Sequence, residues 1–270
     1  MMRETQTSKY IVNEIKKCTH DIVYFVENYI KIKNNITGEE NLIMLYKKQR
    51  EVLESMSKSQ KFCLEAARQS GKTLLSQLYI LWKCNFFKNS KCLMVSINSH
   101  NFKNIANNIE YFQSTIPGWL KSVAVFDSLR WTNENFITFD NGSSISLSIR
   151  STFNPRGQNL SVLIFDEYSF YSELNPLYLT HGIRSDNSET LDFFKNSIIS
   201  TMEGQLIITG TDSPHDNIFK LIKFGGENFT SWTKESMNWD DIPNRGLKWK
   251  NEMIDYIGQK MFEQEFCVEK

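Results

Sequence analysis

The feature that most constrains the fold is a glycine-lysine-threonine sequence between a short apolar run and a longer amphipathic stretch. Residues 61–66 have the apolar pattern of a buried strand, and residues 72–87 have the spacing of a helix. A polar loop at such a junction is typical of phosphate-binding sites, because backbone N–H groups at the start of a helix attract phosphate oxygens. We predict a phosphate-binding loop that consists of Ala67, Arg68, Gln69, Ser70, Gly71, Lys72 and Thr73.

Two residues of this loop carry specific chemistry. Lys72 is expected to contact the β- and γ-phosphates of a nucleotide, and the Thr73 hydroxyl is expected to ligate Mg²⁺. Ala66 stands where the general pattern has its first glycine, so the loop is a variant of that pattern. Taken alone, the same residues are also compatible with an ordinary start of a helix.

The remaining apolar pattern predicts the fold class. Continuous apolar runs, which are typical of strands buried on both faces, cover residues 91–97, 161–165 and 205–209. Helical spacing covers residues 11–32, 45–56, 247–257 and 259–266, and residues 131–149 indicate a hairpin with an Asn-Gly turn. Strands that alternate with helices predict an α/β domain with a mainly parallel sheet flanked by helices. We expect this core to cover residues 1–225, with a small unit, residues 226–270, packed on it.

Two acids follow one of the predicted strands. Residues 161–165 lead directly into Asp166 and Glu167. In a phosphate-binding fold, Asp166 would hold Mg²⁺ and Glu167 would polarise the attacking water. The alternative is a strand that ends in two solvated acids, but the order of the loop and the acid pair along the chain favours the metal-binding interpretation. A further strand end consists of Thr209, Gly210 and Thr211. It could lie beside the γ-phosphate and respond to phosphate loss, or it could be an ordinary exit from a strand into a turn.

Other candidates lie on either side of these segments. The amide of Gln49 offers a donor and acceptors to an adenine edge, and Tyr46 could stack on the base or belong to the core. Arg68 lies inside the phosphate-binding loop. Arg156 lies in an Asn-Pro-Arg-Gly loop, from which it could reach a nucleotide of its own or of a neighbouring subunit, or form a surface ion pair.

Composition limits the choice of partners and compartment. Lys and Arg total 31, as do Asp and Glu, so overall basicity gives no argument for nucleic-acid binding. Any contact with DNA must therefore come from a local patch or from an assembly. Five cysteines without paired spacing favour a reducing compartment. The polar N-terminus and the lack of an apolar run of ~18 residues lead us to expect a soluble intracellular protein.

Together, these segments resemble the ATPase domain of the large terminase subunit of tailed bacteriophages. Residues 21–29 resemble the N-terminal helix of that family, residues 45–49 its adenine motif and residues 67–73 its variant phosphate-binding loop. Residues 156–157, 163–167 and 208–211 fall where the family has its arginine loop, acidic motif and coupling motif, and residues 261–266 resemble the segment that closes the ATPase region.

The resemblance implies a RecA-like P-loop ATPase with a small lid subdomain, and ATP and Mg²⁺ as cofactors. It implies a homo-oligomeric ring, a pentamer, that acts on double-stranded DNA with the portal protein and the small terminase subunit. The location would be the cytoplasm of the host cell, without membrane association. Arg68 and Arg156 would be the candidate cis and trans arginine fingers.

One departure and two alternatives accompany this resemblance. Large terminases usually continue into a nuclease domain that the present sequence does not contain, so we expect no DNA cleavage by these residues. A superfamily 2-type helicase would share the glutamine, the loop and the acid pair, but it would need a second RecA-like domain. A nucleotide-binding assembly module would bind ATP without hydrolysing it.

Overall fold

The computed structural model of the protein describes residues 2–34, 37–96, 98–122, 124–126, 135–149, 159–168, 196–211, 222 and 229–268. Within these ranges the strands of the main sheet are β3 Lys61–Ala66, β4 Lys91–Ser96, β5 Ala124–Phe126, β6 Asn135–Phe139, β7 Ser144–Ile149, β8 Val162–Phe165, β9 Gln205–Gly210 and β10 Thr233–Met237. The helices are α1 Met2–His20, α2 Ile22–Tyr29, α3 Lys47–Lys58, α4 Lys72–Phe86, α5 Ser99–Thr115, α9 Leu247–Ile257 and α10 Gln259–Phe266.

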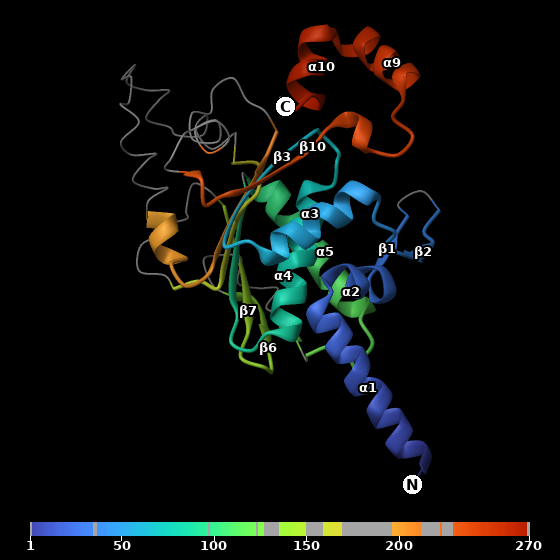
Figure 1. Ribbon diagram of the computed structural model, residues 1–270, viewed down its shortest axis with the longest axis vertical. Helices are drawn as coiled ribbons and strands as arrows, with labels where there is room; N and C mark the ends of the chain where they lie inside the picture. Colours follow the sequence, from blue (N-terminus) through green and yellow to red (C-terminus); the bar gives the residue numbers. More distant parts are fainter. Residues whose placement is uncertain are drawn as a thin grey trace.

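An eight-stranded sheet forms the centre of the described structure (Figure 1). Its strands follow the order β10-β3-β9-β8-β4-β7-β6-β5. From β10 to β7 every pair of neighbours is parallel, whereas β6 and β5 extend the other edge in antiparallel pairing. The predicted hairpin is the β6–β7 pair. The prediction of an α/β fold with a mainly parallel sheet is therefore confirmed.

The apolar runs form central strands because both faces of the sheet are covered. In β3, Phe62 and Leu64 belong to one buried cluster, whereas Cys63 belongs to the cluster on the other face. All of β8 is buried. On the first face, α4 and α5 pack on β4 and β7, and α2 packs on α3 and α4 (Figure 1). A parallel sheet covered in this way leaves its strand ends as the places where polar residues gather.

The N-terminal helical pattern differs from the prediction. The spacing predicts one helix over residues 11–32, but the structure has α1, α2 and a short strand, β1 Lys31–Lys33, paired with β2 Glu40–Leu42. The break lies at Asp21, whose backbone is extended. Its carboxylate caps α2 by accepting a hydrogen bond from Tyr24 N at 2.8 Å. The apolar periodicity continues across this cap and therefore does not reveal it.

The C-terminal segment is connected to both the sheet and the phosphate-binding loop. β10 pairs with β3, so residues 233–237 form an edge strand of the main sheet. The following 3₁₀ turn, Trp239–Asp241, and helices α9 and α10 surround an aromatic cluster that Ala67 joins. The boundary predicted at residue 225 stays a prediction, and the structure places the first strand of the 226–270 unit in the main sheet.

Two further features bear on the sequence expectations. All five cysteines lie in the described part of the chain and are free thiols. Among the described helices, none combines the length and the apolar character needed to cross a bilayer.

Candidate nucleotide site

The loop between β3 and α4 depends on a glycine at its last position. Gly71 has a φ of 92°, in the left-handed region that favours glycine. A Cβ atom here would also lie 2.5 Å from Nε2 of Gln49, so the Gln49 side chain, which donates to Ser70 O, would have to move. Gln69 has a φ of 60°, which is rare for a residue with a side chain. The loop therefore turns sharply before α4 begins at Lys72.

Sheet order brings the predicted site segments together. β3, β9 and β8 are adjacent and parallel, so their carboxyl ends meet at one edge of the sheet. The phosphate-binding loop follows β3, the acid pair follows β8, and Thr209 and Gly210 end β9. The structure thus places the three predicted segments around one point.

Lys72 lies at the centre of this arrangement. Its side chain is 4% exposed, and its Nζ atom lies 3.2 Å from Oε1 of Glu167. The same ammonium donates a hydrogen bond to Ala66 O at 3.3 Å. A buried ammonium requires such partners, because removal from water disfavours its charge.

Asp166 is the most deeply buried acid of the site. Its carboxylate accepts hydrogen bonds from Thr73 Oγ1, at 3.1 and 2.9 Å to its two oxygens, and from Thr209 Oγ1 at 3.0 Å. Burial, followed by the neighbouring charge of Glu167, raises the pKa of Asp166 from its ordinary value of 3.8 to about 6. The two threonine hydroxyls and Lys72 act in the opposite direction. The positive charge around Asp166 therefore does not fully compensate its ionised carboxylate, and a metal ion would supply the missing positive charge.

Glu167 adopts an unusual backbone conformation next to it. Its φ is 55°, in the left-handed region that a residue with a Cβ atom occupies at a cost of roughly 1–3 kcal/mol. Its Oε2 atom is buried and has no hydrogen-bond partner among the described residues. One oxygen thus contacts Lys72, and the other is available to a water molecule or a ligand.

The donor set suits Mg²⁺ with help from a ligand. Thr73 and Asp166 supply hard oxygen donors, which Mg²⁺ prefers together with phosphate oxygens and waters. The described residues contain no cluster of three or more His, Cys, Asp or Glu side chains that could hold a metal ion without a ligand. A magnesium-nucleotide complex fits this site better than a permanently bound metal.

Tyr46 and Gln49 contact the loop directly. Tyr46 OH and Gln49 Nε2 both donate to Ser70 O, at 2.6 and 3.0 Å, and Gln49 Oε1 accepts from Tyr46 N at 3.4 Å. The sequence does not predict these contacts. Their adenine-binding role stays a prediction, since both ends of the Gln49 amide are engaged within the protein.

The structure describes only one of the two predicted arginine fingers, Arg68. Arg68 forms an ion pair with α10, in which Nη1 lies 3.0 Å from Oε2 of Glu265, and its side chain is 62% exposed. Its role as an arginine finger stays a prediction. Arg156 lies outside the described residues.

The contact between Thr209 and Asp166 follows from strand register. Phe165 pairs with Ile208, so the next residues of the two strands, Asp166 and Thr209, lie beside each other. The sequence predicts that this hydroxyl lies near a γ-phosphate, whereas the structure shows that it donates to Asp166. Thr211, the last of the three predicted coupling residues, is buried.

Comparison with known proteins identifies the fold. No protein-family model matches the chain. The ATPase domain of the Thermus phage P74-26 large terminase superposes with a TM-score of 0.58 and 17% identity, over 80% of this chain and 91% of that one. The HK97 bacteriophage large terminase matches with a TM-score of 0.67 and 11% identity, over 93% of this chain and 55% of that one. The chain has the fold of a phage large-terminase ATPase domain.

A third terminase extends this comparison. The large terminase of a thermophilic bacteriophage, solved in complex with ADP, matches with a TM-score of 0.59 and 16% identity, over 83% of this chain and 52% of that one. The present chain therefore spans about half the length of this terminase and of the HK97 terminase, and most of the P74-26 ATPase domain. The predicted P-loop, RecA-like fold is confirmed.

The terminase fold of this chain also includes site contacts that sequence reasoning missed. Three come from the C-terminal segment: Met237 O accepts from Ala67 N at 2.8 Å, Glu265 O accepts from Arg68 N at 2.8 Å, and Arg245 donates to the loop. These residues are separated from the loop by more than half of the chain. No local pattern marks them, and only the cluster of aromatic residues around them hints at a packed unit.

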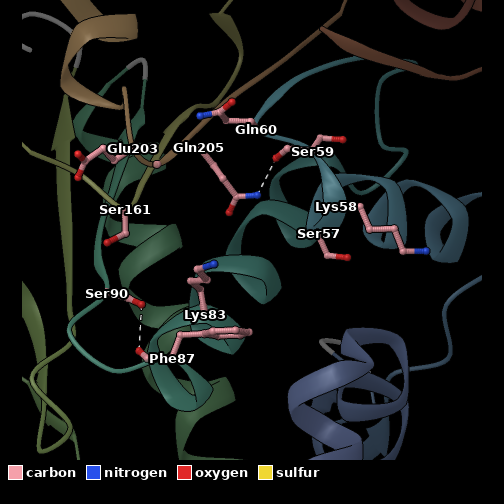
Figure 2. A pocket seen from close by; sticks show the side chains of 11 residues that line it. Ser57, Lys58, Ser59, Gln60, Lys83, Phe87, Ser90, Ser161, Glu203 and Gln205 are labelled. Carbon is pink, nitrogen blue, oxygen red and sulfur yellow. Dashed lines mark hydrogen bonds between the residues drawn. The ribbon is translucent and has the colours of Figure 1, made fainter. Parts of the chain in front are cut away.

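A separate cavity of about 460 Å³ lies at the other edge of the terminase sheet, where β3, β4, β8 and β9 begin (Figure 2). Its polar groups bind mainly to the protein itself. Gln205 Nε2 donates to Ser59 O at 2.6 Å, and Ser90 Oγ donates to Phe87 O at 2.9 Å. Because it lies at the opposite end of these strands from the loop and the acid pair, the cavity is distinct from the candidate nucleotide site, and we assign no function to it.

Proposed function

We propose that this chain is the ATPase motor domain of a terminase that packages double-stranded DNA into a viral prohead. The observation that carries the proposal is the contact between the loop and the acid pair, in which Lys72 Nζ lies 3.2 Å from Glu167 Oε1. This contact supports the proposal, because it joins the lysine of the loop to the acid pair, so that a candidate phosphate-binding cation and a candidate base lie next to each other. The terminase fold supports the choice of motor.

The residues suggest a division of chemical roles. The loop N–H groups and Lys72 would bind the phosphates of ATP. Thr73 and Asp166 would hold Mg²⁺, which would neutralise negative charge on the phosphates. Glu167 would orient the attacking water and accept its proton. Because Lys72 pairs with Glu167 in the structure, phosphate binding would draw the lysine away and leave the carboxylate able to act as a base.

The same contacts suggest how ATP hydrolysis would be coupled to movement. Thr209 Oγ1 donates to Asp166 Oδ1 at 3.0 Å, so a change at the metal-binding acid reaches the end of β9 directly. From there it would pass through Gly210 and Thr211 to the chain that follows. We propose that this is the coupling segment.

We propose the partners that a packaging motor would need. Double-stranded DNA, the portal protein and the small terminase subunit would act together with a homo-oligomeric ring of this chain, a pentamer, in the host cytoplasm. The chain has no net charge, so DNA affinity would arise in the ring and would fall with salt concentration. In such a ring Arg156 would act as a trans finger and Arg68 as a cis finger.

Phosphate release by the purified protein tests the proposed function. We expect ATP hydrolysis to require Mg²⁺, since Asp166 and Thr73 offer one carboxylate and one hydroxyl to a metal ion. We also expect hydrolysis to increase when double-stranded DNA is added to the assembled protein. Hydrolysis stimulated only by single-stranded nucleic acid would favour the helicase alternative. Binding of ATP without any turnover, under all these conditions, would favour the assembly module.

The buried acid predicts a dependence of stability on pH. The folded-state pKa of Asp166, about 6, exceeds its ordinary value of 3.8, so the folded protein binds this proton more tightly than the unfolded chain. Its contribution to the free energy of unfolding is therefore largest below about pH 4 and is lost as the pH rises through 6. The loss amounts to ~3 kcal/mol in the absence of metal.

Urea unfolding of the metal-free protein and of Asp166→Asn measures this contribution. Because the variant cannot ionise here, its stability relative to that of the parent should rise between pH 4 and pH 7. Mg²⁺ with ATP should stabilise only the parent at pH 7. Parallel stability curves for the two proteins would contradict the prediction.

A further inference from the structure

Arg245 connects the C-terminal segment to the phosphate-binding loop. Its Nη1 atom donates to Arg68 O at 3.2 Å, and its Nη2 atom donates to Gln69 Oε1 at 3.3 Å. Arg245 lies immediately before Gly246, the N-terminal cap of α9. One guanidinium thus binds two consecutive residues at the turn of the loop.

Aromatic packing fixes the orientation of this guanidinium. Its Cζ atom lies 4.5 Å from the centroid of the Trp249 ring and 5.6 Å from that of Phe266. Trp249 in turn contacts Phe266 with a centroid separation of 5.4 Å. A planar cation held against aromatic rings loses little further freedom when it binds a carbonyl, so its hydrogen bonds to the loop are pre-organised.

The charges of Arg68 and Arg245 are compensated differently. Arg68 is paired with Glu265 at 3.0 Å. In the described part of the chain, by contrast, no carboxylate lies within ion-pairing distance of Arg245. Partial burial lowers the pKa of Arg245 from its ordinary value, as expected for a guanidinium that is partly removed from water. The hydrogen bonds to the loop are therefore its main polar contacts.

These contacts act on the part of the loop that must present its N–H groups. The carbonyl and N–H of one peptide group point in opposite directions, so the Gln69 N–H points away from Arg245 when Arg68 O points toward it. The N–H groups of Gln69 and Gly71 have no acceptor among the described residues, whereas those of Ala67, Arg68 and Ser70 do. Arg245 therefore holds the peptide whose free N–H group is available to an anion.

We propose that Arg245 is a positioning residue that holds the phosphate-binding loop in its nucleotide-binding conformation from the C-terminal segment. The proposal rests on the proposed function, because the ligand is the triphosphate of ATP. Pre-organisation of the loop lowers the entropic cost of binding. Nucleotide affinity would thus depend on how the segment that carries α9 and α10 is docked.

Two variants and a matched control test this role. Arg245→Ala removes both hydrogen bonds, and Arg245→Lys keeps the cation but loses the two-pronged geometry. Lys250→Ala is the control, because Lys250 also lies over rings of the cluster, 5.5 Å from Trp239 and 5.8 Å from Phe262, but has no hydrogen bond to the described loop. Thermal unfolding followed by circular dichroism verifies that each variant is folded.

Hydrogen exchange without nucleotide gives the first measurement, and it does not depend on activity. The amides of residues 66–72 should exchange faster in both Arg245 variants and at the parent rate in Lys250→Ala. Unchanged exchange in the Arg245 variants, or an equal increase in the control, would overturn the proposal.

The second measurement combines calorimetric titration with ATP, which gives Kd, and steady-state ATP hydrolysis, which gives KM and kcat. Arg245→Ala should raise Kd and KM about tenfold while kcat changes less than threefold, Arg245→Lys should fall between it and the parent, and Lys250→Ala should match the parent. Parent-like ATP affinity in Arg245→Ala would overturn only this proposal. Absence of ATP binding by the parent would overturn the proposed function as well.

Discussion

Replacement of Lys72 by alanine is expected to weaken ATP binding by about 100-fold or more. The Lys72 side chain is 4% exposed and its ammonium would contact the phosphates, while its present partner, Glu167, would remain as an uncompensated negative charge beside them. Removal of one partner of a desolvated charge pair between protein and ligand costs ~3 kcal/mol or more, which corresponds to at least a hundredfold change in affinity. Calorimetric titration with ATP and Mg²⁺ measures the change directly.

Lys83→Ala is the matched control for this experiment. Lys83 lies on the same helix, with its Nζ atom 4.4 Å from the centroid of the Phe87 ring, at the edge of the sheet opposite the loop. Its replacement should leave ATP affinity unchanged. Normal affinity in Lys72→Ala, with the variant shown to be folded, would mean that the loop does not bind nucleotide.

Replacement of Glu167 by glutamine should separate ATP binding from hydrolysis. The amide cannot accept the proton of the attacking water, and general-base catalysis contributes ~10²–10⁴-fold to a rate. We therefore expect kcat to fall by ~10³-fold. ATP affinity should stay the same or increase, because glutamine no longer competes with the phosphates for the Lys72 ammonium.

The control for this variant is Glu203→Gln, an exposed acid in the cavity at the other edge of the sheet. It should leave both kcat and Kd at the parent values. A Glu167→Gln protein that hydrolyses ATP at the parent rate would exclude Glu167 as the base. A parent that binds ATP but shows no turnover to lose would instead support the assembly module.

Both predictions depend on one geometric relation, the convergence of a lysine and an acid pair that are far apart in the sequence. Parallel strand order produces this relation, since β3, β9 and β8 are neighbours and all end at the same edge. An additional consequence is the hydrogen bond from Thr209 to Asp166, which connects the proposed metal-binding acid to the predicted coupling segment. The proposed catalytic residues and the predicted coupling segment are therefore in direct contact.

The sequence by itself determined the local elements and the chemistry of their ends. The apolar runs defined β3, β4, β8 and β9, because strands buried on both faces need continuous apolar residues. The loop pattern and the acid pair predicted which ends are polar. The helix break at Asp21 was missed, because a capping residue inside a continuous apolar period changes the backbone without changing the pattern.

Only the tertiary structure decided which distant groups meet. Two sets of contacts join segments that are too far apart along the chain to leave a periodic signal. Tyr46 and Gln49 contact Ser70 O, and Glu265 and Arg245 contact residues 68–69. Local propensity and apolar spacing report on neighbours within a few turns or strands, whereas these contacts depend on how β10, α9 and α10 pack on the sheet. The sequence thus indicated the residues of the predicted phosphate-binding loop, and the packing of the C-terminal segment decided which distant residues contact that loop.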